Sequence, residues 1–133
     1  MSLANYLENA VINWLRGTAM PSAPGTLYLA LFTADPGETG DLSAEVVTTG
    51  GTAYARTAVA LTAPPSPVSN SADVVFPTAG ASWGVITHAA LVDSPTRGAG
   101  NVLASNALTG GPQTVGAGIT PRFVAGQLTF TLD

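Results

Sequence analysis

The first stretch of the chain has apolar residues at helical spacing. Between residues 2 and 16 apolar side chains recur every three or four positions, which predicts one wide apolar helix face. This face consists of Leu3, Tyr6, Leu7, Ala10, Val11, Trp14 and Leu15. Ser2 is placed to cap the N-terminus, and Gly17 to end the helix in a left-handed conformation. We expect the helix to lie on the protein's own sheet or on a neighbouring subunit, and Trp14 to pack in one of these two ways.

From residue 26 onward the apolar pattern changes to the period of two that is typical of β-strands. Residues 26–32 (TLYLALF) are apolar on both faces, as in strands that are covered on both sides. Further strand-like segments are 54–62, 72–76, 83–92, 101–108, 113–115, 119–124 and 127–132. Gly- and Pro-rich turns separate them, including a Pro-rich link at 63–70 and a tight hairpin turn at 116–118.

This order of elements predicts a mainly β protein. We expect an antiparallel β-sandwich of about seven or eight short strands, preceded by one N-terminal amphipathic α-helix. The predicted organisation is an N-terminal docking helix at 1–17, a Pro/Gly linker at 18–25 and the β-sandwich domain at 26–133.

Composition narrows the function classes. The 133 residues are 46% hydrophobic but only 9% charged, with four Arg, no Lys and a net charge of -4. Such a chain is too apolar for a disordered protein, and it lacks the basic patch of a nucleic-acid-binding protein. It also lacks an apolar run of about 18 residues, so no membrane insertion is expected. Because a protein with so few charged residues has little charge to keep its surface soluble, we expect part of that surface to be covered by neighbouring subunits.

Candidate catalytic and metal-binding residues are few. His88 is the single histidine and there is no cysteine, so we expect no catalytic site, no transition-metal site and no cofactor. The acids Asp35, Glu38, Asp41 and Glu45 cluster in one loop, where oxygen ligands could hold calcium, but their spacing differs from that of an EF-hand. We interpret this segment as a solvated acidic loop. The Gly-rich stretches lack a phosphate-loop ending and are interpreted as turns.

Several segments together resemble a known family. SLANYLENAVINWLRG (2–17), TLYLALFTADPG (26–37), WGVITHAALVD (83–93) and GQLTFTLD (126–133) are similar, in order, to small tailed-bacteriophage virion proteins described as phage tail fibre-like. The resemblance covers nearly the whole chain and implies no catalytic residues. It implies a non-enzymatic virion structural protein, made in the host cytoplasm, that attaches to the particle as a tail or baseplate appendage.

The expected partners follow from this resemblance. They are further copies of the chain, with a trimer favoured, and other virion proteins, with the helix face as the docking surface. A capsid decoration (cement) protein is an alternative placement. A second alternative is a host receptor- or glycan-binding module that uses the loops at 33–53 and 93–100.

Overall fold

A computed structural model describes residues 1–65 and 67–131. The described residues form one α-helix, α1 (Asn5–Leu15), and short strands. In chain order the described strands are β1 (Ser2–Leu3), β2 (Leu27–Phe32), β3 (Thr57–Val59), β4 (Val68–Ser69), β5 (Val74–Val75), β6 (Gly84–Ile86), β7 (His88–Val92), β8 (Val102–Ala107), β9 (Gln113–Val115), β10 (Arg122–Phe123) and β11 (Thr129–Phe130). Within the described chain no helix is long and apolar enough to cross a membrane.

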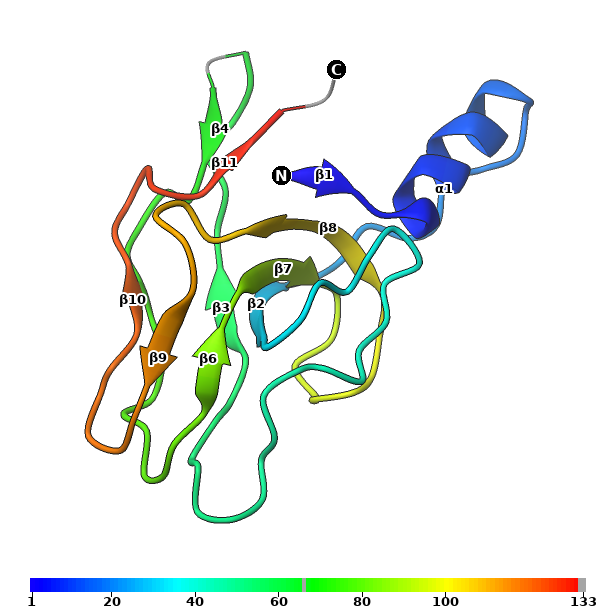
Figure 1. Cartoon of the computed structure of the whole chain (residues 1–133). Coiled ribbons are helices and arrows are strands. Elements are labelled where there is room, and N and C mark those ends of the chain that lie inside the picture. Colours follow the sequence, from blue (N-terminus) through cyan, green and yellow to red (C-terminus); the bar gives the residue numbers. More distant parts are fainter. Residues whose placement is uncertain (66, 132–133) are drawn as a thin grey trace.

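A five-stranded sheet with the order β1-β8-β7-β2-β3 forms the centre of the molecule (Figure 1). All of its neighbouring strands are antiparallel. β2 and β7 pair along five positions, from Tyr28 opposite Val92 to Phe32 opposite His88. The pairing of β7 with β8 shifts by one residue at Leu91/Val92, a β-bulge.

The remaining strands form a second layer, a long and interrupted antiparallel ribbon. Its two arms are residues 68–86 and 113–130, which pair as β4 with β11, β5 with β10 and β6 with β9. Between these pairs, backbone hydrogen bonds such as Phe76 N–H to Pro121 O (2.9 Å) and Ala79 N–H to Ile119 O (2.8 Å) continue nearly the same register. We call this second layer the outer ribbon.

The main core lies between the central sheet and the outer ribbon. The sheet contributes Leu29, Leu31 and Leu91, and the ribbon contributes Phe76 and Val115 among others. Aromatic side chains strengthen this core: the rings of Tyr54 and Trp83 are in edge contact at 5.2 Å, and both rings also contact Phe76. The apolar strand residues predicted as core are therefore buried on this side of the sheet.

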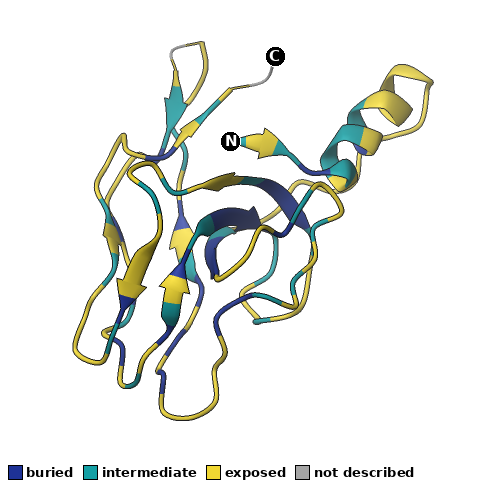
Figure 2. Cartoon of the chain, in the orientation of Figure 1, coloured by how far each residue is buried: buried dark blue, intermediate teal, exposed yellow. Residues whose placement is uncertain are grey.

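The opposite face of the central sheet holds a smaller core. Ala30, Phe32 and Ala90 are buried there, and Leu42 from the loop after β2 packs on them. Apolar residues on both faces of β2 are thus covered, as the double-sided pattern of residues 26–32 predicted. Dark buried strands at the centre and lighter outer strands make the layered arrangement visible in Figure 2.

The structure confirms the fold class: a mainly β, antiparallel, sandwich-like protein with one N-terminal helix. Three details were predicted wrongly. The segment 83–92 is two strands, because the chain passes from the outer ribbon to the central sheet at Thr87. Val68–Ser69 forms strand β4 inside the segment predicted as a Pro-rich link. The turn at 116–118 exists, but β9 and β10 pair with β6 and β5 rather than with each other.

Candidate functional site

Helix α1 begins on the edge of the central sheet. Its N-cap is Ala4, which provides no side-chain cap, and the predicted N-cap, Ser2, lies in β1 instead. The backbone holds the helix start: Ala4 N–H donates to Leu103 O (2.9 Å) and Asn5 N–H to Glu38 O (2.8 Å). Pairing of β1 with β8 therefore fixes where the helix starts, which no local sequence signal could show.

The helix ends as predicted at Gly17. This glycine has a φ of 95°, and its N–H donates to Trp14 O, while Thr18 N–H donates to Asn13 O. These two bonds form a Schellman motif, in which a residue in the left-handed conformation satisfies the last helix carbonyls. The chain then turns back toward β2.

The structure divides the predicted apolar helix face into a covered and an uncovered part. Ala10 is buried, and Leu3, Leu7 and Val11 are half-buried against the rest of the protein. Tyr6 is 39% exposed, Trp14 58% and Leu15 72%. Trp14 lies one turn beyond Ala10 on the same face. The last turn of the helix points away from the sheets (Figure 1). Of the two packings considered for Trp14, packing on its own sheet is not observed.

The uncovered half of the helix continues into an exposed segment. Every residue from 12 to 26 is exposed, and we call this segment the exposed arm (Figure 2). It carries Ile12 (56% exposed) and Met20 (43%) in addition to Trp14 and Leu15. The apolar-face pattern did not select Ile12 or Met20, because one lies off that face and the other beyond the helix.

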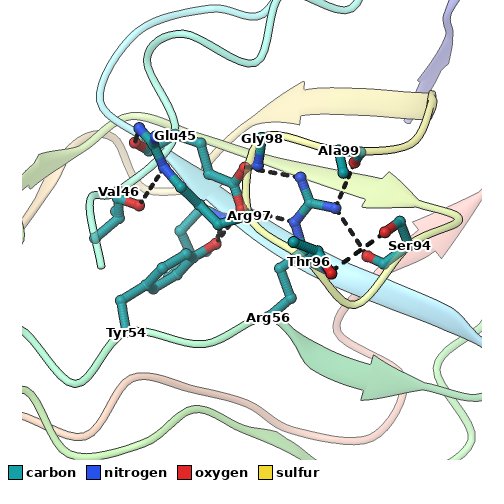
Figure 3. Close-up of polar contacts among 10 residues, drawn as sticks. Glu45, Val46, Tyr54, Arg56, Ser94, Thr96, Arg97, Gly98 and Ala99 are labelled. Carbon is teal, nitrogen blue, oxygen red and sulfur yellow. Dashed lines mark hydrogen bonds and ion pairs between the residues drawn. The ribbon is translucent and has the colours of Figure 1, made fainter. Parts of the chain in front are cut away.

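A buried ion pair lies within the long connection between β2 and β3. Glu45 and Arg56 are bound through Nε to Oε1 and Nη2 to Oε2, both 2.7 Å, and neither side chain is exposed (Figure 3). Arg56 also donates to the carbonyls of Ser94 (2.8 Å) and Ala99 (2.9 Å). A bidentate pair with its remaining donors satisfied is the form in which a buried ion pair is tolerated.

Further contacts of the same acid complete the network. Tyr54 Oη donates to Glu45 Oε1 (3.0 Å) and accepts from Leu31 N–H, while Gly98 N–H donates to Glu45 Oε2. Arg97 donates to the carbonyl of Glu45 (2.8 Å). Burial, and next the negative charge of Glu45, raises the pKa of Tyr54 far above its ordinary value. The loops at 33–53 and 93–100, which were candidate receptor-binding loops, are therefore fastened to each other.

The acidic loop does not bring its carboxylates together. Asp35 accepts from Gly37 N–H (2.8 Å) and Asp41 from Ser43 N–H (2.9 Å), and the latter bond lowers the pKa of Asp41. Glu45, at the end of the loop, is buried, so the interpretation of a wholly solvated acidic loop is wrong for this residue. Among residues 1–65 and 67–131, no group of three or more acids or histidines is placed to hold a metal ion.

His88 lies at the start of β7 with two polar neighbours. Its Nδ1 is 2.8 Å from Thr87 Oγ1, and its Nε2 is 3.8 Å from Asp35 Oδ2. The side chain is 19% exposed, and its backbone pairs with Phe32. These contacts are those of a residue at the boundary of the smaller core.

A family model described as "Podophage GP4 fiber I protein gp80" matches residues 2–131. The chain belongs to this family. The match runs from β1 through the helix and both layers to β11, so the helix with its exposed arm is part of the family domain. No curated protein matches the chain.

Membership in this family confirms the resemblance to phage tail fibre-like proteins. The chain is a structural protein of a phage fibre and thus a virion component. Its mainly β architecture and its exposed arm are features of a phage fibre protein.

Proposed function

We propose that the chain is a non-enzymatic fibre subunit that associates with further copies of itself, and attaches to the virion, through the exposed arm. The observation that carries this proposal is the continuous exposure of residues 12–26, which includes Trp14 and Leu15 at 58% and 72%. A Trp this exposed is unusual in a protein that has a core available, and such aromatics are the common anchors of protein interfaces.

The way the helix is held supports this function. Its first turn is fixed by β1, by Ala4 and by Asn5, whereas its last turn has no cover from the described residues. Because the start of the helix is held in place, the apolar side chains at its uncovered end can bind a partner at little cost in conformational entropy. The Schellman motif at Gly17 keeps the last turn helical and so keeps Trp14 and Leu15 on a defined surface.

Charge supports association between like copies. From residue 12 to 26 the single charged side chain is Arg16, so two arms that meet place few like charges against each other. Homo-oligomers usually have closed cyclic symmetry. Among the cyclic forms we favour a trimer because of the resemblance to phage tail fibre-like proteins, in which trimers are common. Other virion proteins are proposed as the second partner, at the point where the fibre attaches.

Light scattering after size-exclusion chromatography tests the proposal. The purified chain is expected to be an oligomer, and Trp14→Ser together with Leu15→Ser is expected to convert it to a monomer that keeps the wild-type circular dichroism spectrum, with a melting temperature lowered only by the loss of association. Val47→Ser together with Val124→Ser is the matched control, because these residues are 49% and 48% exposed outside the arm. A wild-type chain that stays monomeric at high concentration, and does not bind fibre-less particles, contradicts the proposal.

A further inference from the structure

A cavity of about 380 Å³ lies between the central sheet and the outer ribbon. Its floor includes Leu31, Ile86 and Ala89, which are all buried. Ile119 also belongs to the lining, although this apolar side chain is 49% exposed. A cavity of about 150 Å³ with apolar walls is enough to hold a benzene ring. The cavity of this protein therefore has room for an indole ring and part of a neighbouring side chain.

The charged groups that line the cavity are cations. The Met1 ammonium group donates to Thr129 O (3.1 Å), and both residues belong to the lining. Arg122 also belongs to it, with its guanidinium bound to Asp73. Among residues 1–65 and 67–131, no Asp or Glu lines the cavity. The cavity therefore suits an apolar group that is accompanied by partial negative charge.

The end of helix α1 has both of these properties. Trp14, the bulkiest side chain of the exposed arm, is 58% exposed. The backbone carbonyls at a helix C-terminus carry about half a negative elementary charge, which favours nearby cations. Arg16, the single charged residue of the arm, follows Trp14 by two positions and so lies almost on the opposite side of the helix. Trp14 can thus enter a cavity lined by cations without bringing Arg16 to it.

The arm of a chain is not placed to fill the cavity of the same chain. No residue of the exposed arm lines this cavity. Met1 lines it, whereas Trp14 lies near the far end of α1, whose 11 residues extend over about 16 Å. Figure 1 shows this end of the helix pointing away from the outer ribbon. A Trp14 side chain that enters the cavity must therefore come from a second copy.

We propose that Trp14 of one copy docks in this cavity of the next copy, with the C-terminus of the helix close to the Met1 ammonium group. The contact is head to tail, because the arm of each copy meets a different surface of its neighbour. Such contacts form a closed ring when the rotation between copies allows it, and an open filament when it does not. The inference rests on the proposed self-association through the exposed arm and adds the surface that the arm contacts.

Complementation between two full-length variants tests the docking. Asn106 pairs with Ala89, which in turn pairs with Leu31, so its side chain lies over the floor of the cavity. Because Asn106 is exposed, Asn106→Phe is expected to fill the cavity and to keep the fold. This variant, and Trp14→Ser together with Leu15→Ser, are each expected to be monomeric by light scattering. An equal mixture of the two is expected to form a heterodimer, because one intact arm and one intact cavity remain.

A matched control and a second readout accompany this test. Ala58→Phe changes an exposed position of β3 that does not line the cavity, and it is expected to keep the wild-type oligomer. Acrylamide quenching of fluorescence is expected to show Trp14 protected in the wild-type oligomer, with loss of this protection in Asn106→Phe. Trp83, which is 4% exposed, is expected to be protected in both.

The outcomes separate the docking from the proposed function. An Asn106→Phe chain that keeps the wild-type oligomer, or an equal mixture that stays monomeric, overturns the docking while the wild-type chain still associates through its arm. A wild-type chain that is itself monomeric overturns both.

Discussion

Glu45 and Arg56 face each other in the interior through two hydrogen bonds of 2.7 Å, with no exposure of either side chain. They come from different segments: Glu45 ends the acidic loop, and Arg56 precedes β3. Arg56 continues to the carbonyls of Ser94 and Ala99. One ion pair thus fastens three segments of the chain on one side of the central sheet.

Removing the cation of this pair is expected to destabilise the fold strongly. Arg56→Ala leaves the Glu45 carboxylate buried without its partner, which costs about 3–5 kcal/mol. Urea unfolding of wild type and variant measures this loss. Glu38→Ala, which removes an exposed charged side chain outside the arm, is the control and is expected to change stability by less than about 0.5 kcal/mol. Similar free energies of unfolding for the two variants would show that the Glu45–Arg56 pair contributes little to stability.

Asn70 is a second internal polar residue with a measurable role. It is 1% exposed, its Nδ2 donates to the carbonyls of Ala72 and Val124 (2.9 Å each), and its Oδ1 accepts from Leu128 N–H (2.9 Å). Asn70→Ala leaves these backbone groups unpaired, at about 1–3 kcal/mol for each group that water cannot reach. The melting temperature of Asn70→Ala is expected to be several degrees lower than that of wild type, whereas the melting temperature of Asn9→Ala is expected to be unchanged. An unchanged melting temperature would contradict the role assigned to Asn70.

The Asp73–Arg122 contact predicts an acid-dependent loss of stability. Hydrogen bonding from Ala125 N–H, and then the contact with Arg122, lowers the pKa of Asp73 below its ordinary 3.8. A lowered folded-state pKa stabilises the fold at pH values above 3.8, and this contribution is lost as the pH falls through the lowered value. Urea unfolding from pH 7 to pH 2 is expected to show wild type more stable than Asp73→Asn at neutral pH, with the difference shrinking below about pH 4. A difference that stays constant with pH would contradict this assignment.

Two glycines without positive φ make a matched pair. A Cβ at Gly80 would lie 2.4 Å from the carbonyl oxygen of Gly51, whereas one at Gly116 would meet nothing within 4 Å. Gly80→Ala must move backbone and is expected to cost about 1–3 kcal/mol. Gly116→Ala is expected to be neutral or to stabilise by about 0.4–1 kcal/mol, because alanine reduces the freedom of the unfolded chain. Thermal unfolding of both variants measures the contrast, and equal melting temperatures would contradict the close approach at Gly80.

Assembly links these predictions to function. Arg56, Asn70 and Gly80 act within the subunit, so their variants are expected to lose stability of the folded chain itself, while the arm variants at Trp14 and Leu15 are expected to lose association and to keep the folded subunit. Measuring association and the folded-state spectrum of each variant therefore separates the two roles.

Apolar spacing by itself determined the helix, the strand-rich remainder and the helix end at Gly17. These features depend on neighbouring residues: a period of 3.6 or of two buries one face, and glycine adopts positive φ without strain. The order of motifs along the chain also determined the family.

Tertiary structure alone decided where the helix face is left uncovered, which acid is buried and which strands pair. Trp14 lies one helix turn after Ala10 on the same apolar face, yet Ala10 is buried and Trp14 is 58% exposed. In the sequence Glu45 cannot be distinguished from the nearby acids Asp35 and Asp41. In the structure its carboxylate is buried because Arg56, eleven residues away, and Gly98 donate hydrogen bonds to it. The solvent exposure of these side chains depends on contacts between segments that are distant in the sequence. The apolar periodicity of one segment cannot predict such contacts.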